Sequence, residues 1–295
     1  MKTPILALII LSAWAPQAMS QTASSPPQSA NFNRLRDRGD GVPSSIFGTY
    51  IRKGEVLVYP FFEYYRDHDF EYEAFELGFG SDITERFGRY RAKEGLIFLG
   101  YGLTDDLAFE IEAAVISATL DKAPDDTTPV PPRLEESGLG DVEAQLRWRW
   151  RRETQTRPEL FSYFETTFPL QRDKVLIGTQ AWEFKLGVGV VRGLRWGTIT
   201  GRLAVEFTGG SIEPGEYAVE YLRRINRHLR VFAAVEGSED EVEAITELQV
   251  FLANHVYVKL NNAFGVTKKA TDWAPEVGIM FVLNGREDAN RFRSR

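Results

Sequence analysis

Cysteine is absent from this 295-residue sequence, and histidine occurs only three times. The lack of cysteine excludes disulfide bonds, thiol nucleophiles and thiolate metal sites. Beyond about residue 20 there is also no long apolar run, because charged residues recur every few positions and the mean hydropathy is −0.27. The net charge of −7 argues against a nucleic-acid partner. Nothing in the sequence indicates a cofactor or nucleotide site.

The one apolar run lies at the N-terminus and has the layout of a secretory signal. Lys2 supplies a positive charge, residues 5–15 form an apolar core, and Ala18 to Ser20 are small residues of the kind that a signal peptidase reads. The core is roughly half of the ~20 residues that a membrane-spanning helix needs. We therefore predict a cleaved signal peptide over residues 1–20 and export from the cytoplasm.

Residues 21–53 follow with a Ser-, Pro- and Gln-rich stretch and then a basic one, without periodicity. This composition favours a flexible leader on the periplasmic side. The alternative is a plug, in which the chain folds back into a barrel and Arg34, Arg36 and Arg38 pair with interior carboxylates. The sequence leaves both interpretations open.

The most informative stretch runs from Asp141 to Arg151, where odd positions are charged or amide and even positions are apolar. Side chains of a β-strand point alternately to opposite faces, so this stretch has one polar face and one apolar face. The apolar face carries Leu146, Trp148 and Trp150. A membrane-spanning β-barrel requires this contrast, with lipid outside and water or polar packing inside.

The same alternation recurs between residues 54 and 283 and gives about twelve strands, separated by short turns and longer polar loops. The predicted strands lie at about 54–65, 91–102, 106–117, 139–152, 159–169, 181–191, 197–208, 215–224, 229–237, 242–253, 255–267 and 273–283. In lipid only helices and closed barrels satisfy all backbone polar groups. We therefore predict an all-β fold, an antiparallel up-and-down transmembrane β-barrel over residues 54–283, followed by a polar tail over residues 284–295. An even strand number places both termini in the periplasm, and the choice between twelve and fourteen strands stays open.

The alternation also assigns side chains to the two faces of the barrel. The residues expected to face the lumen as pore lining are Glu110, Glu112, Asp141, Glu143, Gln145, Arg147, Arg149, Glu183, Lys185, Arg202, Glu206, Glu247, Lys259 and Glu276. The residues expected at the lipid face and its aromatic girdles are Trp148, Trp150, Trp182, Trp196, Trp273 and Phe281. Because the inward set contains both signs of charge, an ion-selective pore and a salt-bridged filling are both consistent with it.

No catalytic constellation is evident. His68 lies between Asp67 and Asp69, but neighbours on an extended strand point to opposite faces, so we expect neither carboxylate to orient the imidazole. We therefore predict no catalytic residues, no metal site and no cofactor.

Two short motifs carry a resemblance to a known family. They are Tyr101-Gly102-Leu103-Thr104-Asp105-Asp106-Leu107, at a turn between strands, and Gly138-Leu139-Gly140-Asp141-Val142-Glu143, at the start of a strand. The sequence resembles the bacterial family named for the meta-pathway of phenol degradation, whose members are outer-membrane β-barrels described as transporters. One departure is the polar tail after Phe281, because many outer-membrane barrels end on an aromatic residue that the insertion machinery reads.

The pattern predicts, and the resemblance supports, an outer-membrane channel for passive passage of small molecules. That the molecules include hydrophobic or aromatic compounds is implied by the resemblance alone. The expected partners are outer-membrane lipids and lipopolysaccharide, the barrel-insertion machinery and the small-molecule solute. The alternatives are a structural or adhesive barrel with a plugged lumen and a hydrolase active at the barrel rim.

Overall fold

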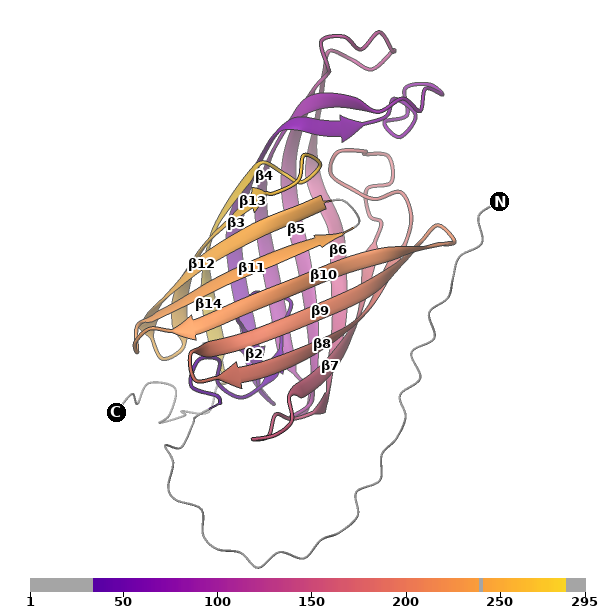
Figure 1. Cartoon of the computed structure of the whole chain (residues 1–295). Coiled ribbons are helices and arrows are strands. Elements are labelled where there is room, and N and C mark those ends of the chain that lie inside the picture. The colour runs from indigo at the N-terminus through magenta and orange to yellow at the C-terminus, as the bar shows by residue number, and fades with distance from the viewer. Residues whose placement is uncertain (1–33, 239–240, 285–295) are drawn as a thin grey trace, which may run out of the picture. The chain divides into compact units, whose positions relative to one another are not determined.

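The computed structural model describes residues 34–238 and 241–284. The predicted signal peptide, the leader up to residue 33 and the tail from residue 285 lie outside the described residues. Twelve strands form a closed barrel in which each strand pairs antiparallel with its neighbours in sequence, and β14 closes onto β3 (Figure 1). The predicted fold class is therefore confirmed.

The barrel strands are β3 (Val56–Tyr72), β4 (Arg86–Gly102), β5 (Leu107–Asp121), β6 (Arg133–Arg151), β7 (Glu159–Phe168), β8 (Glu183–Leu194), β9 (Gly197–Thr208), β10 (Ser211–Arg224), β11 (Leu229–Ser238), β12 (Glu241–Ala253), β13 (Val256–Gly265) and β14 (Trp273–Leu283). Before them, β1 (Val42–Pro43) and β2 (Tyr50–Ile51) pair as a separate two-stranded sheet. The two described ranges contain no helix with the length and hydropathy needed to cross a membrane.

The strand connections give the barrel two different ends. The short-turn end contains the connections 103–106, 152–158, 195–196, 225–228 and 254–255. The long-loop end contains the connections 73–85, 122–132, 169–182, 209–210 and 266–272. Two hairpins extend further than the sequence predicts, because β3 and β4 stay paired as far as Tyr72 and Arg86, and β5 and β6 as far as Asp121 and Arg133.

Alternation along β6 places polar side chains inside the barrel and apolar side chains outside. Arg147 and Arg149 are 1% and 3% exposed, whereas Trp148 and Trp150 are 53% and 62% exposed. The alternation changes phase near Gly140, where the β5–β6 register shifts. A β-bulge inserts one extra residue into a strand and so exchanges the two faces beyond it.

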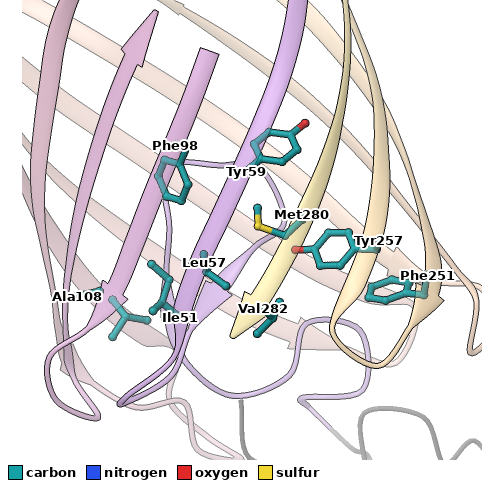
Figure 2. Close-up of a cluster of buried hydrophobic side chains, with 10 residues drawn as sticks. Ile51, Leu57, Tyr59, Phe98, Ala108, Phe251, Tyr257, Met280 and Val282 are labelled. Carbon is teal, nitrogen blue, oxygen red and sulfur yellow. The ribbon is translucent and has the colours of Figure 1, made fainter. Parts of the chain in front are cut away.

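Apolar side chains fill the interior at the short-turn end. Val42 and Ile51 are fully buried among residues from several barrel strands, and Figure 2 shows Ile51 beside Leu57, Phe98 and Ala108. Burial of a side chain such as Ile51 contributes about 1.5–3 kcal/mol. The β1–β2 hairpin is therefore anchored to the inner wall.

Candidate functional site: the interior of the barrel

The structure places the predicted lumen residues on inward positions of their strands, with one exception. The inward residues are Glu110, Glu112, Glu143, Gln145, Arg147, Arg149, Glu183, Lys185, Arg202, Glu206, Glu247, Lys259 and Glu276. Asp141 lies at the bulge of β6, where its carboxylate accepts hydrogen bonds from backbone N–H groups of the 169–182 loop, including that of Leu170 at 2.8 Å.

The predicted lipid-face residues lie on the outer surface. Trp148, Trp150, Trp182, Trp196, Trp273 and Phe281 are all between 36% and 62% exposed. The outer wall also contains an apolar groove of about 600 Å³ where Gly201 lies between Val190 and Val219 of the neighbouring strands. An outer surface this apolar is disfavoured in water.

Residues 34–55, here called the luminal segment, contact inward-facing residues at the short-turn end. Arg38 is buried and forms salt bridges with Glu159 at 3.0 Å and Glu153 at 3.2 Å. Arg149 donates to Asp40 at 3.1 Å and to the Gly41 carbonyl at 2.7 Å. Two buried arginines, one from the segment and one from the wall, thus join the segment to the barrel.

Further contacts hold the tip of the luminal segment against opposite walls. Ser45 donates to Glu110 from its backbone N–H at 2.9 Å and from its hydroxyl at 2.6 Å. The carbonyl of Phe47 accepts a hydrogen bond from the Lys259 ammonium at 3.0 Å, and the Phe47 ring stacks on Phe232 at 5.1 Å. The segment therefore reaches from β5 to β11 and β13.

The first family-like motif, residues 101–107, lies where the luminal segment meets the wall. A Cβ on Gly102 would come within 1.9 Å of the Arg52 carbonyl oxygen, so only glycine permits this approach. Asp106 accepts hydrogen bonds from Arg149 at 2.9 Å and Arg152 at 3.0 Å. Burial by itself would raise the pKa of Asp106, but the two guanidinium groups hold that pKa below its ordinary value.

The pKa of the Asp40 carboxyl is set by the same two opposing effects, burial and a neighbouring guanidinium. Burial opposes its ionisation, but the charge and hydrogen bond of Arg149 lower the pKa of Asp40 below its ordinary value. A cleft of about 470 Å³ opens beside this pair, lined by Arg52, Lys53, Asp105 and further backbone of the segment. The ion pair therefore borders an opening at the short-turn end.

The second family-like motif, residues 138–143, holds a loop at the opposite end. Leu176 and Ile177 of the 169–182 loop are buried against inward-facing side chains of β4, β5 and β6. The Glu136 carboxylate accepts from the Leu176 N–H at 2.8 Å. A Cβ on Gly140 would come within 2.7 Å of the Ile116 side chain and 3.5 Å of the Ile177 carbonyl oxygen. Gly140 therefore leaves room for the Ile116 side chain, and Asp141 of the motif bonds the loop through the Leu170 and Thr179 N–H groups.

Between these two ends the lumen wall is charged. A cavity of about 120 Å³ lies next to Ser45 and is lined by four carboxylate-bearing residues, Glu110, Glu112, Glu143 and Glu165. The neighbouring wall contains Glu63 and Glu94, which face each other across β3 and β4.

Sequence reasoning missed Glu63, Glu94 and Glu165 as inward-facing residues. On β3 the inward face also carries Tyr59 and Phe61, so both faces of the strand look apolar and the period-2 contrast is lost. The one sequence signal for Glu63 was its spacing: it is two residues from Phe61 and four from Tyr59, so all three side chains share one face of the strand.

The carboxylate beside the His68 imidazole comes from neither Asp67 nor Asp69 but from a distant loop. Nδ1 of His68 lies 2.5 Å from Oδ2 of Asp272, and the His68 backbone N–H donates to the same oxygen at 3.0 Å. The partner comes from the 266–272 loop, 204 residues away, which neighbour analysis cannot find. Both side chains are about half exposed. Among residues 34–238 and 241–284, no group of three histidines or carboxylates is placed to hold a metal ion.

No family model matches this sequence. No curated protein gives a significant match either.

Solved structures do show similarity. The COG4313 outer membrane channel from Pseudomonas putida F1 has a TM-score of 0.59 and 12% identity, over 82% of this chain and 100% of that chain. The translocator domain of the autotransporter NalP from Neisseria meningitidis has a TM-score of 0.43 and 10% identity, over 78% of this chain and 88% of that one. A FadL homologue of Pseudomonas aeruginosa has a TM-score of 0.30 and 7% identity, over 77% and 88% of the two chains. Of these three, the P. putida channel alone exceeds 0.5, and at this identity it shows a shared fold. This chain therefore has the fold of an outer-membrane β-barrel.

Proposed function

We propose that this protein is an outer-membrane channel for passive passage of small molecules, partly closed at its short-turn end by the luminal segment. The observation that carries the proposal is the division of the closed barrel into an apolar outer face and a charged inner face that encloses cavities. Outer-membrane barrels have this division, with their short turns on the periplasmic side. The luminal segment would then lie at the periplasmic end.

The proposed partners follow from the two faces. Lipids and lipopolysaccharide would cover the apolar outer wall, and the barrel-insertion machinery would recognise the last strand, where Phe281 is exposed on the outer face. The further expectation that the solute is hydrophobic or aromatic comes from the family resemblance. Inward-facing rings such as Tyr59 and Phe61, which stack at 4.7 Å, are compatible with it.

The test is single-channel conductance of the full-length mature protein in planar bilayers, compared with Arg38→Gln. Removing one partner of a buried ion pair costs about 3–5 kcal/mol, so the variant should loosen the luminal segment from Glu153 and Glu159. Arg34→Gln is the matched control, because no salt bridge of Arg34 is seen within the described part of the chain.

Conductance steps in all three proteins would support an open channel. Steps in Arg38→Gln alone would support a channel closed by the luminal segment. Silence in all three, from protein that shows the heat-modifiable mobility of a folded barrel, would refute the channel and favour the structural or adhesive barrel. That second candidate is supported by the packing of the luminal segment and the 169–182 loop against the inner wall.

The rim hydrolase remains a third candidate because of the His68–Asp272 pair, since a carboxylate that bonds an imidazole can orient it for acid–base chemistry. We propose that the pair is structural and that the protein is not an enzyme. Hydrolysis of a peptide or ester substrate that is lost in His68→Ala would overturn this.

A further inference from the structure

One arc of the inner wall, formed by β14, β3, β4, β5 and β6, carries carboxylates that face one another. The register places Glu63 opposite both Glu276 and Glu94, and Glu112 opposite Glu143. We call these five residues the carboxylate wall. Within the described ranges, no Lys or Arg nitrogen lies within 4.0 Å of any of their carboxylate oxygens.

The inward-facing cations elsewhere in the lumen are engaged by other groups. Lys185 pairs with Glu165 at 2.9 Å. Arg202 pairs with Glu220 at 2.7 Å and with Glu236 at 3.2 Å. These pairs lie on β7 to β11, and their cationic nitrogens form no salt bridge with a residue of the carboxylate wall.

Two further inward cations, Lys259 and Arg147, contact the luminal segment. Lys259 lies 2.9 Å from Glu247 and donates to the Phe47 carbonyl. Arg147 lies 3.5 Å from Glu110 and donates to the Pro43 carbonyl. These two cations therefore hold the segment in place, and their carboxylate partners, Glu247 and Glu110, are not among the five residues of the carboxylate wall.

Because the strand register sets the carboxylates of the wall opposite one another, they are stabilised by positive charge that comes from outside the protein. Like charges directly opposite on adjacent strands are destabilising. Glu110 also lines the cavity that borders Glu112 and Glu143, and its Oε1 is a buried carboxylate oxygen without a hydrogen-bond partner among the described residues. Leaving such an acceptor unsatisfied is costly. A cation in this cavity would offset the like charges of Glu112 and Glu143 and would also give Oε1 of Glu110 a partner.

We infer that the carboxylate wall makes the lumen selective for small cations over anions. The inference rests on the proposed channel function and names the class of solute that the channel passes. A low-dielectric passage lined by one sign of charge concentrates ions of the opposite sign and excludes ions of the same sign.

The experiment is the reversal potential across a planar bilayer in a KCl gradient, with whichever of the full-length mature protein and its Arg38→Gln variant conducts. We expect a potassium-to-chloride permeability ratio of roughly ten or more. In the double variant Glu112→Gln and Glu143→Gln the ratio should fall several-fold toward one. Glu135→Gln is the matched control, because Glu135 lies on the same strand with an exposed side chain and pairs with Arg133.

The outcomes separate the two proposals. A conducting channel with a ratio near or below one would overturn the cation selectivity and leave the channel intact. A high ratio that persists in the double variant would overturn the role of Glu112 and Glu143. Silence of every folded form would overturn the channel itself, and the selectivity with it.

Discussion

Neighbouring substitutions on β6 test which face of the barrel meets lipid. Leu146 is 42% exposed, lies between Gln145 and Arg147 on its strand and is opposite Phe164 of β7. Leu146→Arg therefore places a guanidinium on the outer wall. Near the bilayer midplane this costs about 2–4 kcal/mol, which lowers the folding equilibrium constant roughly 30- to 1000-fold.

Gln145→Arg changes the adjacent residue but points inward. Gln145 is 5% exposed, donates to Glu165, accepts from Arg147 and borders the cavity that Glu110 and Glu143 also line. A guanidinium there has carboxylate partners, and charge-assisted hydrogen bonds of this kind are strong. We therefore expect Gln145→Arg to be tolerated, with a much smaller loss of stability than that of Leu146→Arg.

The assay is urea unfolding in lipid vesicles, followed by the mobility difference between folded and unfolded barrel on unheated gels. Leu146→Ala separates the loss of the leucine side chain from the cost of the charge. Equal unfolding free energies for Leu146→Arg and Gln145→Arg, or a greater loss for Gln145→Arg, would refute the assignment of faces.

Two further predictions concern the luminal segment. The lowered pKa of Asp40 means that its bond to Arg149 is present above the ordinary carboxyl range, near pH 4, and is lost as the pH falls through the lowered value. A nitroxide spin label attached at neutral pH to Ile46→Cys, in a chain without natural cysteine, should therefore become more mobile only below about pH 4; a label mobility independent of pH would contradict this. Gly102→Ala should destabilise the barrel by about 1–3 kcal/mol, because its Cβ would collide with backbone of the segment. Gly95→Ala, whose Cβ meets nothing within 4 Å, should unfold at the same urea concentration as the unmodified protein.

The two motifs that carry the family resemblance have related positions in the structure. Residues 101–107 receive the luminal segment at the short-turn end, and residues 138–143 receive the 169–182 loop at the other end. In each motif a glycine permits close approach and an aspartate accepts hydrogen bonds. Such motifs are evident in sequence as turn chemistry, but the segments that they contact are not.

Alternation in the sequence predicted most of the strands and their two faces, and it put their number at about twelve, which is the number in the closed barrel. Alternation is a local property of extended backbone, so β9 and β14 begin and end at the predicted residues, 197–208 and 273–283. It failed where both faces are apolar, as on β3, and where a bulge changes the phase, as at Asp141. Both failures have a cause within a single strand. On β3 the two faces do not differ in polarity, and at Asp141 the extra residue of the bulge shifts the alternation.

Which charged side chains pair with one another depends on the tertiary structure. Arg38 reaches Glu159 across 121 residues, and His68 reaches Asp272 across 204 residues. The basic stretch of the leader has no periodicity, so nothing in it indicates whether it is solvated or packed. Closure of β14 onto β3 sets the register that leaves Glu63 between two other carboxylates. Such pairings depend on the register and closure of the whole barrel, which local backbone geometry does not fix.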